Sequence, residues 1–314
     1  MSMAPSPLRD AVDAELQRAL PAEVTSFAEQ LAQRGGNTVV AVLFYGSNLR
    51  TGDLDGVLDF YVLVDELSQW HRHRITALAN RALPPNVSYE TTQIDALDLR
   101  AKVAVLSLGQ FERGMREGAI DTTLWARFAQ PLGLAWVRDD AARAATAAAV
   151  SSALTTAARW AALLGPLSGE ASAFWQALFQ KTYAAELRVE RGGGRARSLI
   201  EHERERYTRL LPLAWRAAGI DFRVRGEQLE PRLDEARRRR SARAWMLRHA
   251  MGKPLNLMRL TKAAFTFENG ADYVAWKVER HSGVRLELSD WQRRHPLLAA
   301  PGVLWQLRRR GAIK

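Results

Sequence analysis

Residues 39–65 read VVAVLFYGSNLRTGDLDGVLDFYVLVD. The apolar run Val39–Tyr45 ends at Gly46-Ser47. Eleven residues separate Ser47 from an aspartate, Asp59, which stands near the start of the second apolar run, Val57–Val64. Short apolar runs bounded by glycine are typical of buried strands. We therefore expect two neighbouring strands, with a Gly-Ser turn at the end of the first and a carboxylate near the start of the second.

These residue types suit phosphate chemistry. Gly46 lacks a Cβ, so its backbone can approach a phosphate closely. Ser47 offers a hydroxyl and a backbone N–H to phosphate oxygens, and we expect the neighbouring Asn48 to bind nucleotide with it. Asp59 is the candidate catalytic carboxylate and Mg²⁺ ligand, because Mg²⁺ prefers carboxylate and phosphate oxygens. Nucleotidyl transfer depends mainly on positioning and charge neutralisation, so the pattern indicates a nucleotidyltransferase site.

The second metal carboxylate of polymerase-β-type sites is missing. It would stand two residues after Asp59, on the same face of the strand, but that position is Tyr61. Asp65 is too distant to replace it, because six residues of straight strand span about 20 Å. Glu90, on an expected third strand, is the favoured second metal ligand. The loop residues Asp53 and Asp55 remain alternatives.

Composition narrows the class of protein. Of the 314 residues, 47% are apolar and 25% are charged, as in a folded globular protein. The absence of cysteine excludes disulfides, zinc–thiolate sites and thiol nucleophiles. The formal charge of +11 favours an anionic partner. Residues 1–10 lack the order of a signal peptide, and no apolar run approaches the roughly 20 residues that span a bilayer.

The order of the elements predicts an α+β fold with three regions. We expect a nucleotidyltransferase domain with a mixed sheet at residues 1–138, a helical, winged-helix-like domain at 139–240, and a basic C-terminal region at 241–314. Within the first, the patterns predict helices at 8–33 and 68–82, strands at 39–45, 57–64, 87–94 and 102–106, and a short helix near 111. Beyond it, they predict helices at 140–164, 170–191, 195–218, 237–252, 255–266 and 270–281, and a hairpin at 222–229.

Several short motifs carry a resemblance to a known family. They are Tyr45-Gly46-Ser47, the single Asp59, Asp65, Trp70-His71, KVAVLS at residues 102–107, and TYAAELR at residues 182–188. Together they resemble the mitochondrial phosphatidate cytidylyltransferases, the translocator assembly and maintenance family of CDP-diacylglycerol synthases. The likeness covers residues 38–215 in patches and none of the last hundred residues. Ala185 and Glu186 depart from the glycine and aspartate of the family.

The resemblance implies a reaction and further site residues. CTP and phosphatidate would give CDP-diacylglycerol and pyrophosphate with Mg²⁺, and a single aspartate would be expected. Lys102 would be a catalytic, phosphate-binding cation, or else an ordinary lysine at a strand end. His71 would contact the nucleotide or orient Asp65, or else only begin a helix. Arg188 would meet a phosphate, or else form a surface salt bridge.

A membrane-surface role is expected of the C-terminal region. The apolar segment 296–307 contains Trp305 and precedes Arg308–Arg310, a combination that suits an interfacial anchor. Each basic residue near an anionic leaflet contributes about 1 kcal/mol. We therefore expect a cytoplasmic protein, peripheral on the inner face of a membrane. The alternative is a helix packed on the body of the protein, with solvated arginines.

Other functions remain open from the sequence. The acceptor could be another phospholipid-like molecule, an RNA end or a protein hydroxyl. Because Tyr61 stands where a second metal carboxylate is expected, the protein could also bind nucleotide without turnover. A nucleic-acid-binding protein would explain the charge and the run Arg237–Arg240, but it leaves Gly46-Ser47 and Asp59 unexplained, so nucleic acid is the less favoured partner. Nothing in the sequence indicates the oligomeric state.

Overall fold

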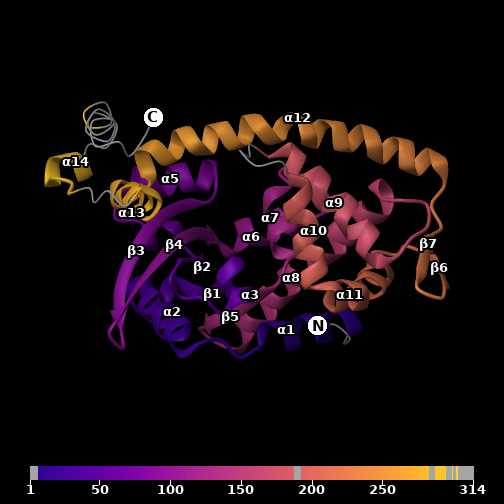
Figure 1. Ribbon diagram of the computed structural model, residues 1–314, viewed down its shortest axis with the longest axis horizontal. Helices are drawn as coiled ribbons and strands as arrows, with labels where there is room; N and C mark the ends of the chain where they lie inside the picture. Colours follow the sequence, from indigo (N-terminus) through magenta and orange to yellow (C-terminus); the bar gives the residue numbers. More distant parts are fainter. Residues whose placement is uncertain (1–5, 187–191, 283–286, 295–298, 300–301, 303–314) are drawn as a thin grey trace.

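A computed structural model describes residues 6–186, 192–282, 287–294, 299 and 302. Figure 1 shows a sheet region on one side, a helical region on the other, and one long helix that runs along both. The first region carries a five-stranded mixed sheet, so the expected α+β class is confirmed.

The sheet has the strand order β3-β4-β2-β1-β5. Its strands are β1 (Val39–Tyr45), β2 (Val57–Val64), β3 (Asn86–Ile94), β4 (Leu97–Ser107) and β5 (Leu132–Val137). Strands β2 and β4 run parallel, and the other neighbouring pairs run antiparallel. The bounds expected for β1 and β2 are confirmed, whereas β5 was not predicted from the sequence.

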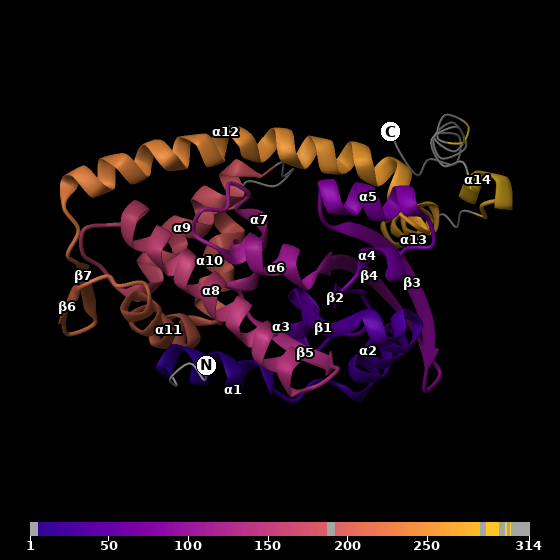
Figure 2. The ribbon, with the colours of Figure 1, turned by 180° about the vertical axis from the view of Figure 1, so that it is seen from behind.

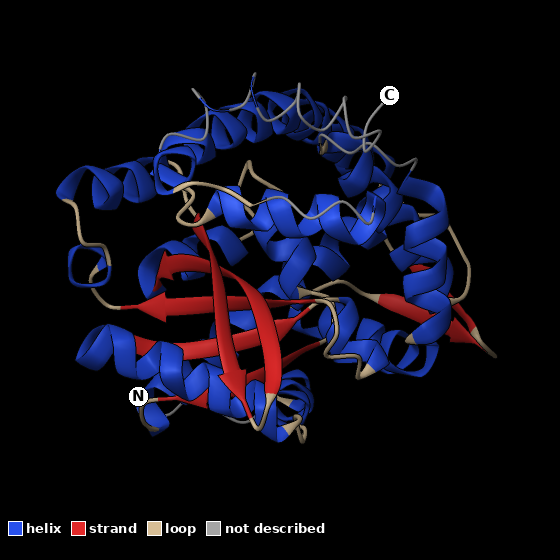
Figure 3. Ribbon diagram, turned by 60° about the vertical axis from the view of Figure 1, so that its left-hand side comes forward, coloured by secondary structure: helices blue, strands red, loops and turns tan. Residues whose placement is uncertain are grey.

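The two faces of the sheet bury different clusters. On one face, Phe44 and Phe60 pack with Phe27 of α2 (Ala22–Gly35). On the other, Tyr61 packs against Phe128 of α7 (Thr123–Phe128), within the cluster that also includes the helical region. Figure 3 shows the twisted strands between these helical layers. Because side chains alternate between faces along a strand, Asp59 and Tyr61 share the face opposite to Phe60.

The N-terminal helix expected at 8–33 is instead two helices. Helix α1 spans Pro7–Leu16, and α2 begins after Pro21, which adopts an extended conformation (ψ 144°) at its N-cap. Proline lacks an N–H and disfavours helical geometry in the residue before it. The helix expected at 68–82 is likewise divided, into α4 (Leu67–Trp70) and α5 (Arg74–Ala82).

The helical region is built around α8 (Asp140–Leu164), whose N-cap Asp139 accepts a bond from the Ala142 N–H. Among the described helices, α8 alone is long and apolar enough to cross a bilayer, although 67% of its most apolar window is buried in the protein. It therefore serves as a core helix, and it exceeds the length that the sequence analysis allowed for any apolar run. Around it lie α6 (Leu108–Met115), α9 (Ala171–Ala185), α10 (Gly192–His202), α11 (Arg204–Ala217) and the hairpin β6–β7 (Phe222–Arg225, Gln228–Pro231).

Helix α12 (Glu235–Thr266) joins the two regions, as Figures 1 and 2 show from opposite sides. The stop expected at Gly252-Lys253-Pro254 was wrong, because Pro254 lies inside the helix. A Cβ on Gly252 would lie 2.3 Å from the Ala185 carbonyl oxygen, so this glycine lets α12 pass against the end of α9. Trp245 anchors the helix, with its ring 5.3 Å from that of Trp160. The chain continues into α13 (Gly270–Ser282) and α14 (Asp290–Arg294).

These contacts bear on the expected domain division. A single hydrophobic cluster includes Leu8 of α1, Tyr61 of the sheet, Trp175 of α9 and Trp245 of α12. The core therefore continues across residue 138, and the boundary expected at residue 240 falls inside α12. The three expected regions therefore share one core and are described as parts of the sequence.

Candidate active site

A cavity of about 700 Å³ lies between the sheet and the helical region. Its floor comes from β1, β2 and β4, and its walls come from α3 (Ser47–Thr51), α7, α9, α10 and α12. Four residues that the sequence analysis singled out line it together: Gly46, Ser47, Asp59 and Lys102.

The Gly46 turn and the Asp59 carboxylate lie close together. Tyr45, the residue before the turn, is the antiparallel ladder partner of Asp59. Gly46 has a φ of 99°, a conformation that favours glycine. A Cβ at this position would lie 2.8 Å from Asp59 Oδ2. Glycine is therefore required twice, by its backbone conformation and by the closeness of the carboxylate.

Lys102 is brought to Asp59 by the parallel pairing of β4 with β2, in which the two residues are ladder partners. The Lys102 ammonium lies 4.3 Å from the ring centroid of Tyr273, on α13. Tyr273 also packs against Tyr89, the partner of Lys102 on β3. An element from the C-terminal region thus helps to position the lysine at the cavity floor.

Tyr61 occupies the position two residues after Asp59, and its hydroxyl accepts a hydrogen bond of 3.0 Å from Arg127 Nη1. The same nitrogen donates to the Tyr45 hydroxyl at 3.3 Å. The interaction with Tyr61 raises the pKa of Arg127, against the opposing effect of burial. Burial raises the pKa of Tyr45, although Arg127 counteracts this. At neutral pH the cavity thus holds a guanidinium cation beside a protonated Tyr45.

Helix α12 supplies a second cationic wall. Arg259 forms an ion pair with Asp121 and donates to the Pro84 carbonyl, and Lys262 donates to the carbonyls of Leu83 and Pro85. Burial, followed by the charge of Arg259, lowers the pKa of Lys262 to about 8. Burial tends to raise the pKa of Asp121, but the pairing with Arg259 outweighs it and the pKa lies below its usual value.

Glu90 does not belong to this site, which corrects the expected second metal ligand. Its ladder partner is Ala101, which packs in the cluster on the α2 face of the sheet. The carboxylate forms a 2.9 Å ion pair with Arg34 of α2 and accepts a bond from the Ser88 hydroxyl. The strand partner of Lys102 is Tyr89, the residue before Glu90. Because side chains alternate along a strand, Glu90 and Lys102 face opposite sides of the sheet.

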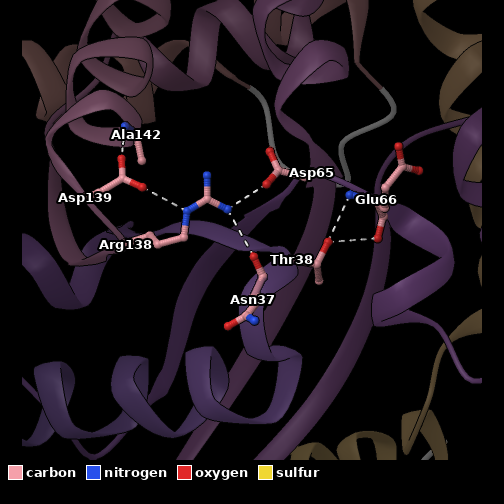
Figure 4. Close-up of polar contacts among 7 residues, drawn as sticks. All are labelled: Asn37, Thr38, Asp65, Glu66, Arg138, Asp139 and Ala142. Atoms are coloured by element: carbon pink, nitrogen blue, oxygen red, sulfur yellow. Dashed lines mark hydrogen bonds and ion pairs between the residues drawn. The ribbon is translucent and has the colours of Figure 1, made fainter.

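His71 does not line the cavity, which corrects its expected contact with nucleotide. It is buried, and its Nε2 lies 2.9 Å from the Asn80 amide nitrogen. The expected pairing with Asp65 is also wrong. Asp65 instead accepts a bond of 2.6 Å from Arg138. Arg138 also donates to Asp139 (Figure 4).

Asn48 is buried beneath the turn and does not line the cavity. Its amide nitrogen donates to the Asp53 carbonyl at 2.7 Å, and its Oδ1 accepts from the Ser47 hydroxyl at 3.3 Å. Asn48 therefore braces the loop that carries Ser47, and its expected role in nucleotide binding is replaced by an indirect one. Asp53 and Asp55 also lie outside the cavity lining. Arg188 lies outside the described residues.

Four cations of the described cavity lining were missed by the sequence analysis. Arg50 lies one helical turn after Gly46 and donates to its carbonyl oxygen at 3.2 Å. Arg127, Arg259 and Lys262 are distant in sequence from the Gly-Ser motif, and no local pattern marked them. The spacing of Arg50 from Gly46 was the one signal that could have been found.

The described residues contain no cluster of three or more histidine or acidic side chains that could hold a metal ion by themselves. Asp59 is the carboxylate at the cavity floor. A single carboxylate suits Mg²⁺ when substrate phosphates supply other ligands, which is the usual mode for this ion.

Comparisons with known proteins gave limited similarity. No protein family model matches the chain, and no curated protein is similar to it at a significant level. Among solved structures, a nucleotidyltransferase-like protein from Exiguobacterium sibiricum 255-15 is similar at 11% sequence identity and a TM-score of 0.26. The similarity covers 92% of this chain and 91% of that one. A superposition this loose transfers no function, so the cavity itself must support one.

Proposed function

We propose that this protein is a Mg²⁺-dependent nucleotidyltransferase. The observation that carries the proposal is that Gly46, Ser47, Asp59 and Lys102 line one cavity, with the glycine turn against the carboxylate. These are the groups that a transferred nucleotide needs: a close backbone approach, a hydroxyl donor, a metal-binding carboxylate and a cation.

The charge of the cavity supports a triphosphate substrate. Its described lining includes five basic side chains and two carboxylates, and one of those carboxylates, Asp121, is already paired with Arg259. The basic side chains are Arg50, Lys102, Arg127, Arg259 and Lys262. Such a surplus attracts and neutralises a polyanion in a site partly shielded from water.

Mg²⁺ fits at Asp59. The carboxylate lies at the floor beside a turn without a side chain, which leaves space where a triphosphate can approach. Bound there with phosphate oxygens, Mg²⁺ would neutralise charge on the triphosphate and help to align it. Lys102, the ladder partner of Asp59, would hold a phosphate oxygen from the other side.

In the reaction, an oxygen of the acceptor attacks the α-phosphorus of the nucleotide. The bond from the α-phosphorus to its bridging oxygen breaks, and pyrophosphate leaves with the electron pair of that bond. Ser47 and Lys102 would bind phosphate oxygens, and their fixed positions would favour the in-line arrangement of the attacking and leaving oxygens.

The acceptor we propose is phosphatidate, with CTP as the nucleotide, so that the product is CDP-diacylglycerol. The motif resemblance supports this choice. An apolar part of the cavity wall supports it independently, because Leu124, Leu199, Leu260 and Ala263 lie beside the cationic groups. A phosphate with an attached apolar body suits such a surface. Access to this lipid would place the protein at the inner face of a membrane, with the basic C-terminal segment as anchor.

The test is a screen of the four ribonucleoside triphosphates for Mg²⁺-dependent pyrophosphate release, with and without phosphatidate vesicles. We expect release with CTP and phosphatidate, and its loss in Asp59→Asn. Glu90→Gln is the matched control, since it removes one acidic charge on the other face of the sheet and should keep activity. Release that survives in Asp59→Asn would reject the site. Release with CTP and another acceptor would keep the transferase and change the lipid.

A further inference from the structure

The position that would carry a second metal carboxylate carries a cation-binding tyrosine instead. Tyr61 shares a strand face with Asp59, two residues away, and its hydroxyl binds the Arg127 guanidinium at 3.0 Å. Tyr45, the ladder partner of Asp59, binds the same guanidinium nitrogen at 3.3 Å. We call these three residues, Tyr45, Tyr61 and Arg127, the tyrosine–arginine bracket.

Arg127 keeps its full positive charge within the bracket. In the part of the chain that the structure describes, both of its hydrogen bonds go to hydroxyl groups through Nη1, and the charges of Glu186 and Asp59 act on it more weakly than Tyr61 does. Its carbon Cζ lies 5.4 Å from the Tyr45 ring centroid and 5.9 Å from that of Tyr61. The rings fix the orientation of the cation without neutralising it.

Other partly buried arginines of this protein are used differently. Arg206 pairs with Glu15 and donates to the Ala129 carbonyl. Arg248 donates to the carbonyls of Glu117 and Ala119. Each of these connects helices or loops through strong acceptors, as a structural arginine does. Arg127 has two hydroxyl acceptors instead, and unlike Arg206 and Arg248 it lines the cavity, where a ligand can meet its charge.

We propose that Arg127 takes the place of a second metal ion, so that the site uses one divalent cation at Asp59 and binds the triphosphate directly on the bracket. This inference rests on the proposed nucleotidyltransferase function and specifies how its triphosphate is held. Two-metal sites bridge their ions with carboxylates at short range. Here a fixed cation stands beside Asp59, which repels a second divalent ion and offers a planar donor group that suits phosphate.

Binding without metal provides the first test. The probe is inorganic tripolyphosphate, titrated calorimetrically into the full chain in EDTA. Wild type should bind it, and Arg127→Met should bind it at least about tenfold more weakly, because a charge-assisted bond in a shielded site is lost. Arg138→Met is the matched control, because Arg138 pairs with Asp65 and Asp139 outside the cavity (Figure 4). Its affinity should equal that of wild type.

The number of metal ions provides the second test. Electron paramagnetic resonance with Mn²⁺ and α,β-methylene CTP should show bound Mn²⁺ without coupling between ions, because two ions about 4 Å apart would couple. A coupled Mn²⁺ pair in wild type would overturn the inference. Equal tripolyphosphate affinity in wild type and Arg127→Met would overturn it too.

Tyr61→Phe keeps the proposal testable if Arg127→Met fails to fold. It preserves the ring and removes only the hydroxyl that holds Arg127, so the thermal midpoint should change little and the metal-free affinity should fall severalfold. Unchanged affinity would contradict a positioning role for Tyr61. These measurements need no turnover. If pyrophosphate release fails, the proposed transferase activity is rejected, while the role of Arg127 in binding tripolyphosphate is still tested.

Discussion

Asp59 on β2 and Lys102 on β4 are ladder partners across the parallel pair of strands at the floor of the cavity. Their side chains share one face of the sheet, so the pairing itself places the proposed metal-binding carboxylate beside the proposed phosphate-binding cation. The sheet therefore sets the spacing of the two groups, and neither depends on a mobile loop for its position.

Replacing Lys102 should impair turnover strongly. We expect Lys102→Met to lower kcat/KM for pyrophosphate release by about a hundredfold, the usual cost of one preorganised donor at a developing charge. Lys102→Arg should retain part of the rate. Arg100→Met is the control, because Arg100 lies on the same face of β4 and outside the cavity lining. Equal losses in Lys102→Met and Arg100→Met would indicate a general charge effect.

Adding a methyl group at Gly46 should damage the site more than the fold. The Cβ of Gly46→Ala would press on Asp59 Oδ2, and a φ of 99° would also be strained. Gly219→Ala introduces strain at a φ of 64° with no atom within 4 Å of the Cβ. Both variants should lose about 1 kcal/mol of stability in chemical denaturation, but only Gly46→Ala should lose nucleotide binding. Full binding by Gly46→Ala would contradict the close approach.

Stability should depend on pH through His71. Burial, and then Lys262, lowers the pKa of His71 to about 4, whereas the unfolded chain titrates near 6.5. The unfolded state therefore binds the extra proton first, and the stability present above pH 6.5 is lost as the pH falls toward 4. The loss is at most about 3 kcal/mol. Urea unfolding at pH 7.5 and 5.0 should show a smaller pH effect in His71→Gln, and equal pH effects would refute it.

The ion pair between Glu15 and Arg206 should stabilise the contact of α1 with α11. Its side chains are only 10% and 9% exposed, and their atoms lie 2.9 Å apart. Glu15→Ala leaves a buried cation, which should cost about 3 kcal/mol of unfolding free energy. Glu235→Ala removes a carboxylate from an exposed pair with Arg239 and should cost less than about 0.5 kcal/mol. Similar losses in the two variants would show that burial does not matter here.

Membrane binding should depend on the basic C-terminal segment. The full chain should sediment with vesicles that contain phosphatidate, and a shortened chain that ends at Trp291 should not, because it lacks the apolar segment and Arg308–Arg310. Binding of the full chain should weaken in high salt. Equal sedimentation of the two chains would place the lipid contact elsewhere.

The floor of the site could be predicted from the sequence because most of its residues lie within or next to short, recognisable sequence patterns. The glycine turn follows β1 directly, and the apolar runs fixed the bounds of β1 and β2. Lys102 was assigned through a motif resemblance, and the register of β4 with β2 brings it to Asp59. For these residues, strand alternation and turn chemistry are enough.

The walls could not be predicted, because they depend on which strand face each residue occupies and on contacts across the chain. Glu90 differs from Tyr89 by one position, and that step moves it to the α2 face. Arg127 reaches the cavity from α7 through two tyrosines that a sequence pattern reads as core. Pro254 suggested the end of a helix, but packing of Trp245 and the passage of Gly252 against α9 favour a continuous α12.

The course of α12 has a consequence for synthesis on the ribosome. Residues 39–137 contain all five strands of the sheet, yet Arg259, Lys262 and Thr266, which complete the cavity lining, are made more than a hundred residues later. The last side chains of the cavity wall are therefore added only when the ribosome has made the C-terminal part of α12. Under the proposed function, the complete nucleotide site thus exists only after α12 has been made, although the carboxylate and the lysine at its floor are made much earlier.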